Sequence, residues 1–118
     1  MVTVEDVRQL ALTLPRTTEH FIHGRVKFRV KQIVYVSFSR DGSLMGFGFP
    51  KDERAALVES EPDKFQLPRE SDLRFHWVVA RMDALDLEEM TELVTDAWAM
   101  VVPKFLVREH FAELPDHE

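Results

Sequence analysis

Residues 25–31 alternate between positively charged and apolar side chains. The charged positions are Arg25, Lys27, Arg29 and Lys31. The apolar positions are Val26, Phe28 and Val30. Successive side chains of a β-strand point to opposite faces, so this spacing predicts a strand with one apolar and one cationic face. The apolar face needs a second layer of structure to cover it, whereas the cationic face is left for solvent or a partner.

Further strand-like segments surround this one. Residues 33–39 and 44–49 are rich in the β-branched and aromatic residues that favour strands. Residues 40–43, between them, have Asp-Gly at their centre, which is typical of a tight hairpin turn. Residues 17–23 are expected to be a short extended segment. Residues 74–82 are largely apolar on both faces, so we expect that strand to lie centrally in the sheet.

An amphipathic helix is predicted over residues 4–14. Thr3 and Asp6 have the spacing of a capping box, with the usual Glu or Gln replaced by a shorter acid. Pro15 ends the helix because it pushes the preceding residue out of the α region. Its apolar stripe has spacings of three and four and consists of Val4, Val7, Leu10, Ala11 and Leu14.

A second long helix is predicted after Asp86, which is a suitable N-cap. Pro103 ends or kinks this helix, and a further helical turn or two can follow it. The apolar stripe consists of Leu87, Met90, Leu93, Val94, Ala97, Trp98 and Val101. We expect Trp98 and Trp77 to be core residues.

The connection between the hairpin strands and the last strand contains a short predicted helix, residues 53–60, with Asp52 as its N-cap. Residues 62–74 are expected to be irregular, with Phe65 and Leu67 anchoring them to the core. The order of elements predicts an α+β fold, an antiparallel β-sheet with N- and C-terminal helices packed on one face. We expect a single domain over residues 1–118, with a frayed tail after about residue 112.

Composition narrows the function. The chain has no cysteine, which excludes disulfides and thiolate chemistry. It shows no signal-peptide pattern and no apolar run of membrane-spanning length, so we expect a cytoplasmic protein. The net charge of −6 argues against general polyanion binding, but the charge is unevenly distributed. Residues 25–31 carry four cations and no anion, whereas residues 86–96 carry five acids and no cation.

The cationic strand face is the main candidate site. Cations at every second strand position lie about 6.5–7 Å apart, a spacing that can follow a nucleic-acid backbone. The candidate residues are Arg25, Lys27, Arg29, Lys31, Arg40 at the hairpin tip, and Tyr35, which could stack or donate a hydrogen bond. The alternative interpretation is a solvated sheet face, or an edge strand that lysine protects from aggregation.

Other constellations favour structural interpretations. The acids of residues 86–96 could hold a divalent cation, but acids near a helix N-terminus also stabilise the helix dipole. His20, His23 and His76 lack the partners of a metal site, so we expect no metal and no cofactor. The serines and glycines form no nucleophile elbow or phosphate loop, so we expect no catalytic residue and no enzyme.

The assembled pattern resembles the MmcQ/YjbR family of small bacterial proteins, in a divergent subgroup. The resemblance rests on Val-Arg-Gln-Leu-Ala-Leu-Thr-Leu-Pro at 7–15, Thr-Thr-Glu at 17–19, Gly24 leading to Lys-Phe-Arg-Val at 27–30, Ile-Val-Tyr-Val at 33–36, Trp-Val-Val at 77–79, and Ala97-Trp98 with Val-Pro-Lys at 102–104. Val26 stands near the place where the family usually has a proline, and residues 46–51 differ from the commoner form.

The resemblance implies a fold similar to the bacterial frataxin homologue, a double-wing-like two-layer sandwich. It also implies DNA binding through the sheet face, as members of the family are commonly labelled. We therefore expect a small binding domain for DNA or another polyanion. A protein–protein interaction module without a nucleic-acid role is an alternative, and a frataxin-like metal-handling protein is a further one.

Overall fold

The chain folds into one six-stranded antiparallel sheet with helices, as seen in a computed structural model that describes residues 1–112. The tail after residue 112, predicted to fray, lies outside the described residues. The elements in chain order are α1 (Val4–Ala11), β1 (Thr17–Ile22), β2 (Arg25–Val30), β3 (Ile33–Phe38), β4 (Leu44–Gly48), α2 (Arg54–Ser60), β5 (Phe65–Gln66), the short 3-10 helix η1 (Glu70–Asp72), β6 (Trp77–Arg81), the 3-10 helix η2 (Met82–Ala84), α3 (Leu87–Ala99) and α4 (Lys104–Ala112).

The strand order in the sheet is β1-β2-β3-β4-β6-β5. The first four strands form a meander, and β6 returns to lie between β4 and β5. The strand within residues 74–82 was predicted to lie centrally; it is an interior strand but next to last in the sheet, and its outer neighbour β5 has only two residues. The two-residue strand β5 was not predicted, because so short a segment forms a strand only through its pairing with β6.

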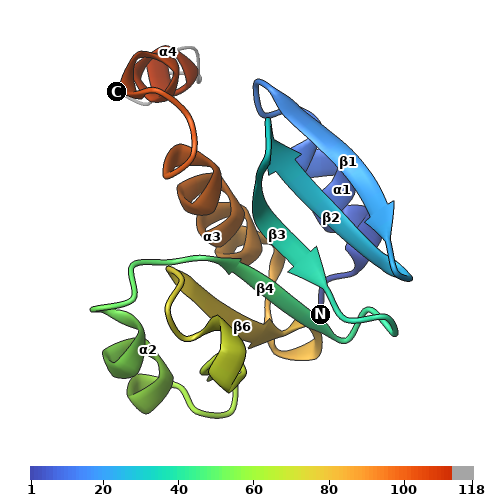
Figure 1. Cartoon of the computed structure of the whole chain (residues 1–118), viewed down its shortest axis with the longest axis vertical. Coiled ribbons are helices and arrows are strands. Elements are labelled where there is room, and N and C mark those ends of the chain that lie inside the picture. Colours follow the sequence, from blue (N-terminus) through green and yellow to red (C-terminus); the bar gives the residue numbers. More distant parts are fainter. Residues whose placement is uncertain (113–118) are drawn as a thin grey trace.

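The helices α1 and α3 cover one face of the sheet, and Figure 1 looks onto the opposite face, which we call the outer face. Between sheet and helices lies a core that includes Phe28, Phe47, Val94 and Trp98, all fully buried. The predicted α+β architecture, with helices against an antiparallel sheet, is thus confirmed. α4 stands at the end of α3 and has no fully buried residue.

The capping predictions are confirmed for both long helices. The Thr3 hydroxyl accepts the Asp6 N–H at 3.2 Å, and Asp6 in turn accepts the Thr3 N–H at 3.0 Å. At the start of α3, Asp86 accepts the Glu89 N–H at 2.8 Å. These caps satisfy backbone donors that have no partner inside the helix.

Four local predictions are wrong. Helix α1 ends at Ala11 rather than residue 14, because the next residues make tighter turns back to Leu10 and Ala11. The N-cap of α2 is Glu53, not Asp52, and no side chain caps it. Leu67 is 47% exposed and anchors nothing, whereas Phe65 is buried as expected. Trp77 is only half-buried, unlike Trp98, because its indole lies on the backbone of Gly46 in the neighbouring strand.

None of the helices in the described part of the chain is long and apolar enough to cross a membrane.

The contact between Trp77 and Gly46 leads to a prediction. A Cβ at position 46 would lie 2.5 Å from Trp77 Nε1, so Gly46→Ala must displace the indole, at a cost of about 1–3 kcal/mol in unfolding free energy. Gly48→Ala is the matched control, because its Cβ would meet Ala97 Cβ at an ordinary 3.6 Å. Urea unfolding measures both variants, and equal midpoints for the two would contradict this account.

Candidate nucleic-acid interface

The strand β2 presents its cations as the sequence pattern predicts. Phe28 and Val30 are buried in the core. The alternate residues Arg25, Lys27 and Arg29 are half-buried and lie on the outer face. Because Phe28 and Val30 cannot leave the core without exposing apolar surface, the outward direction of these three cations is fixed by packing.

Lys31 does not continue this row. It lies in the turn between β2 and β3 with a φ of 55°, in the left-handed region, and its side chain is exposed. The alternation holds only while the backbone is extended, so it ends at Val30. Lys31 stays at the end of the strand as an exposed cation, outside the row of the other three.

The prediction that Tyr35 belongs to the candidate interface is wrong. Its side chain is fully buried, and its hydroxyl forms a 2.7 Å hydrogen bond with the Thr17 hydroxyl. The cause is a β-bulge: Phe28 pairs with Val36 and Arg29 pairs with Val34, so Tyr35 is an extra residue in β3. A buried ring cannot stack on a base, so Tyr35 is removed from the candidate interface.

Arg29 already forms a hydrogen bond within the protein. One terminal nitrogen, Nη2, donates to His20 Nδ1 at 3.2 Å. His20 Nε2 lies 2.9 Å from the Thr18 hydroxyl, so the ring bridges Thr18 and Arg29. Since a guanidinium only donates, Nδ1 must be the accepting nitrogen. The Arg29 Nε is buried and has no hydrogen-bond partner among the described residues.

Arg40 is held in place by the adjacent hairpin. Its Nε donates to the His23 carbonyl at 3.0 Å. Its aliphatic stem passes over Gly24, where an added Cβ would lie 3.4–3.5 Å from the Arg40 side chain. Gly24 also has a φ of 78°, which favours glycine. The side chain therefore crosses from the β3–β4 turn to the β1–β2 turn.

The turn that carries Arg40 is fixed by Asp41. The carboxylate accepts hydrogen bonds from the Ser43 N–H at 3.0 Å, the Ser43 hydroxyl at 2.8 Å and the Ser39 hydroxyl at 2.8 Å. These bonds, those from Ser43 first, lower the pKa of Asp41 to about 2. The turn is thus held by a carboxylate that stays ionised at neutral pH.

Three of the predicted cations meet around one hollow, together with an arginine that was not predicted. We call this the basic hollow; its volume is about 280 Å³. Its lining residues are Ile22, His23, Arg25, Lys27, Arg40 and Arg69. Arg29 and Lys31 do not line it. Sequence reasoning missed Arg69 because it lies in a connection whose path over the sheet has no local sequence signal.

The path of that connection depends on Arg54, which was also missed. Arg54 is nearly buried in α2, and its guanidinium donates to three carbonyls of the segment before and at the start of β6. The acceptors are Phe75 at 2.8 Å, Trp77 at 3.2 Å and Leu73 at 2.5 Å. A buried guanidinium with such partners is satisfied, and it fixes the segment next to Arg69.

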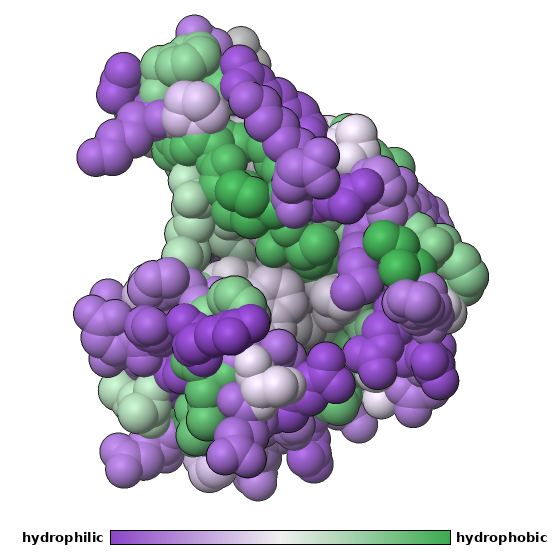
Figure 2. All heavy atoms as spheres, in the orientation of Figure 1, coloured by the Kyte–Doolittle hydropathy of each residue, from purple (hydrophilic) through white to green (hydrophobic). Residues whose placement is uncertain are grey.

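The candidate cations have no acidic partners close by. No carboxylate of residues 1–112 lies within 4.0 Å of Arg25, Lys27, Arg29, Lys31 or Arg40. Arg69 differs, because its Nε lies 3.0 Å from an Asp72 carboxylate oxygen. Figure 2 shows hydrophilic side chains together with some hydrophobic ones on the part of the outer face formed by β1 and β2. The five cations are therefore not neutralised by carboxylates of the described residues, although Arg29 is partly covered, since its Nε is buried.

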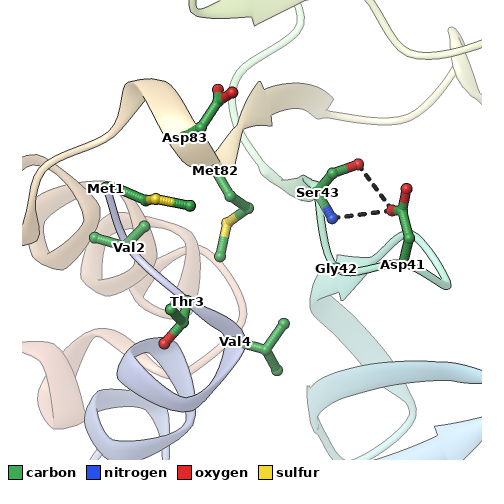
Figure 3. Close-up of a pocket in the computed structure, with 9 residues that line it drawn as sticks. All are labelled: Met1, Val2, Thr3, Val4, Asp41, Gly42, Ser43, Met82 and Asp83. Carbon is green, nitrogen blue, oxygen red and sulfur yellow. Dashed lines mark hydrogen bonds between the residues drawn. The ribbon is translucent and has the colours of Figure 1, made fainter.

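A larger pocket of about 410 Å³ lies on the other side of the β3–β4 turn. In Figure 3, the side chains of Met1, Val4 and Met82 reach into it, while Asp41 is held by Ser43. The remaining ionisable side chain of its lining is Asp83. The lining of this pocket contains two acids and no arginine or lysine, so it does not extend the basic hollow.

No group of three or more His, Asp or Glu side chains within the described residues is placed to hold a metal ion.

The comparisons with known proteins identify a family. A family model described as YjbR matches residues 12–100. The chain is also similar in structure to Deinococcus radiodurans protein DR2400, a protein with a DUF419 domain, with a TM-score of 0.76 and 19% sequence identity. The superposition covers 100% of this chain and 97% of that one. At this identity the likeness shows the fold alone. No curated protein matches the chain.

The burial of Tyr35 leads to a prediction about alkaline pH. Burial, opposed by the hydrogen bond with Thr17, raises the pKa of Tyr35 from 10.0 to about 12. A raised pKa stabilises the folded state, and the stabilisation is fully present below pH 10, the pKa of an ordinary tyrosine. This contribution to the unfolding free energy, on the order of 2 to 3 kcal/mol, is lost as the pH rises through about 12. Tyr35→Phe should remove this part of the pH dependence.

The measurement compares urea unfolding of the wild type and Tyr35→Phe from neutral pH to about pH 12. At neutral pH the variant should be less stable by about 1 kcal/mol, because it lacks the hydrogen bond with Thr17. As the pH rises above about 10, only the wild type has this tyrosine to ionise, and its loss exceeds the difference at neutral pH. The two stability curves should therefore cross, with the variant the more stable protein near pH 12. Parallel curves would show that Tyr35 does not titrate in this way.

Proposed function

The chain belongs to the YjbR family, and we propose that it is a non-enzymatic cytoplasmic domain that binds DNA through the outer face of its sheet. The observation that carries the proposal is the group of outward cations without nearby carboxylates. Its members are Arg25, Lys27, Arg29, Arg40 and, at the end of the strand, Lys31.

The proposed contacts are mainly to phosphates. Arg25 and Lys27 are adjacent on one face of β2, about 6.5–7 Å apart at the Cα atoms, and Arg40 reaches them from the next hairpin. With Tyr35 buried, we propose no base stacking from this face. Phosphate contacts fix position and orientation but carry no sequence information, so we propose weak sequence preference.

The protein's net charge of −6 makes this patch distinctive. A uniformly acidic protein repels a polyanion, whereas a local cationic surface attracts one when salt does not screen it. Binding through three or four phosphates should therefore be strongest at low salt. The logarithm of the association constant should fall with the logarithm of salt concentration with a slope of about −3 to −4.

We predict that Arg25→Glu combined with Lys27→Glu weakens binding to a duplex oligonucleotide by at least about tenfold, because two phosphate contacts become repulsive. Fluorescence anisotropy at about 50 mM salt, with duplex and single-stranded probes, measures the effect. Lys104→Glu combined with Arg108→Glu is the matched control, since it changes the net charge equally but on exposed positions of α4.

If both double variants lose affinity equally, net charge and not this face governs binding. If the wild type binds neither probe at low salt, the DNA proposal fails. Circular dichroism of each variant should match the wild type, because none of the four substituted side chains belongs to the buried core.

A second candidate function is pairing with another protein chain along β1. This strand is at the edge of the sheet and pairs only with β2 among the described residues. Phe21 on β1 is 72% exposed, an unusual exposure for a large aromatic side chain next to an open strand edge. Strand addition at such an edge uses backbone hydrogen bonds and side-chain contacts together.

If β1 pairs with a second copy of the chain, the mass from light scattering should rise above the 13.8 kDa of one chain as the concentration increases. Phe21→Ser should return the mass to one chain, because it removes the apolar contact. Leu12→Ser is the control, since Leu12 is also exposed, at 51%, but lies after α1. If the wild type keeps the mass of one chain at every concentration, pairing between two copies is excluded.

A further inference from the structure

The basic hollow differs from an ordinary cationic surface in how its residues are assembled. Arg25 and Lys27 come from β2, Arg40 comes from the β3–β4 turn, and Arg69 comes from the connection between β5 and η1. Three separate parts of the chain thus bring four cations to one depression. No acidic side chain belongs to its lining.

Two of these cations are oriented by the protein itself. The Nε of Arg40 donates a hydrogen bond to the His23 carbonyl at 3.0 Å. The four N–H groups of the two terminal nitrogens of Arg40 have no partner among residues 1–112. Arg69 is 72% exposed at its side chain, and its Nε is held by Asp72 at 3.0 Å. Both guanidiniums are tethered at Nε and present their terminal nitrogens.

Arg69 is paired with Asp72, but Arg25, Lys27 and Arg40 have no carboxylate within 4.0 Å among residues 1–112. Placing these like charges around one depression is unfavourable, because like charges repel, and more strongly near a protein surface than in bulk water. The same arrangement becomes favourable when a group with several anionic oxygens occupies the centre. The arrangement therefore fits an anionic ligand better than an empty, merely solvated surface.

We propose that the basic hollow is a binding site for a phosphate monoester, such as the 5′-phosphate at the end of a nucleic-acid strand or a free nucleotide. A monoester carries a charge of about −1.5 to −2 and three terminal oxygens, so different cations can each bind a different oxygen. A phosphodiester within a strand has one charge and two such oxygens, and a carboxylate likewise has two.

The size of the hollow agrees with this ligand. Its volume of about 280 Å³ lies just below the range of about 300–1,000 Å³ that is typical of small-molecule pockets. One wall is formed by Ile22, the apolar member of the lining, which can contact the sugar next to the phosphate. This inference rests on the proposed function, because the hollow and the proposed DNA-binding face share cations. The two can nevertheless be tested separately.

The test uses four probes at about 50 mM salt: a single-stranded oligonucleotide with a 5′-phosphate, the same oligonucleotide with a 5′-hydroxyl, thymidine 5′-monophosphate, and inorganic phosphate. We expect the 5′-phosphate to strengthen oligonucleotide binding by about tenfold, the equivalent of one charge-assisted hydrogen bond. Calorimetry measures each affinity on the full chain.

Arg69→Gln and Arg40→Gln should each remove this preference for the 5′-phosphate. Arg69→Gln is the cleaner variant, because an exposed side chain contributes little to folding, whereas Arg40 also bonds the His23 carbonyl. Arg81→Gln is the matched control, since it is an exposed arginine on β6 outside the lining, and it should keep the preference.

The outcomes separate the two proposals. Equal affinity for both oligonucleotides and no binding of the monophosphate would overturn the phosphate site and leave DNA binding standing. Binding of the monophosphate, lost in Arg69→Gln, without binding of either oligonucleotide would support the site and overturn DNA binding. Competition by the monophosphate or by inorganic phosphate identifies a free anion as a ligand, whereas a preference seen only with the oligonucleotide identifies a strand end. A preference that survives in both Arg69→Gln and Arg40→Gln would also overturn the site.

Discussion

The burial of Phe28 and Val30 beneath β2 is the constraint on which the rest of the outer face depends. Each fully buried side chain of this size contributes about 1.5–3 kcal/mol relative to exposure, so a one-residue shift of the strand is strongly disfavoured. Because the register is fixed in this way, Arg25 and Lys27 must project from the opposite face. The charged surface is a consequence of the packed one.

The turns convert this row of cations into a site. Asp41, ionised at neutral pH, holds the β3–β4 turn, and Arg40 crosses from there to the His23 carbonyl over Gly24. On the other side, Arg54 binds three carbonyls and fixes the segment next to Arg69. Polar groups with satisfied hydrogen bonds thus set the position of guanidiniums whose Nε atoms are used and whose terminal nitrogens are left for a ligand, which is the arrangement that a binding surface needs.

Family membership is secure, but the family match and the structural neighbour supply a fold and no activity. The functional argument therefore depends on the arrangement of charge. Cations without a carboxylate partner among the described residues also lie elsewhere, for example Arg81 on β6 and Arg108 on α4. What sets β2 and the two turns beside it apart is that several cations meet there around one hollow, which favours an anionic partner.

Local patterns in the sequence determined the helix caps at Thr3 and Asp86 and the β2 alternation, because each depends on residues within a few positions of one another. The order of the predicted elements along the chain then indicated the α+β architecture. Tertiary structure alone decided the rest. The bulge that buries Tyr35 arises from a register shift between two strands, and a sequence period cannot reveal it. Arg69 joins the hollow only because a connection, held by Arg54, folds back toward the β1–β2 hairpin. Such placements depend on contacts between segments that are distant in the sequence, so no short stretch of sequence can predict them.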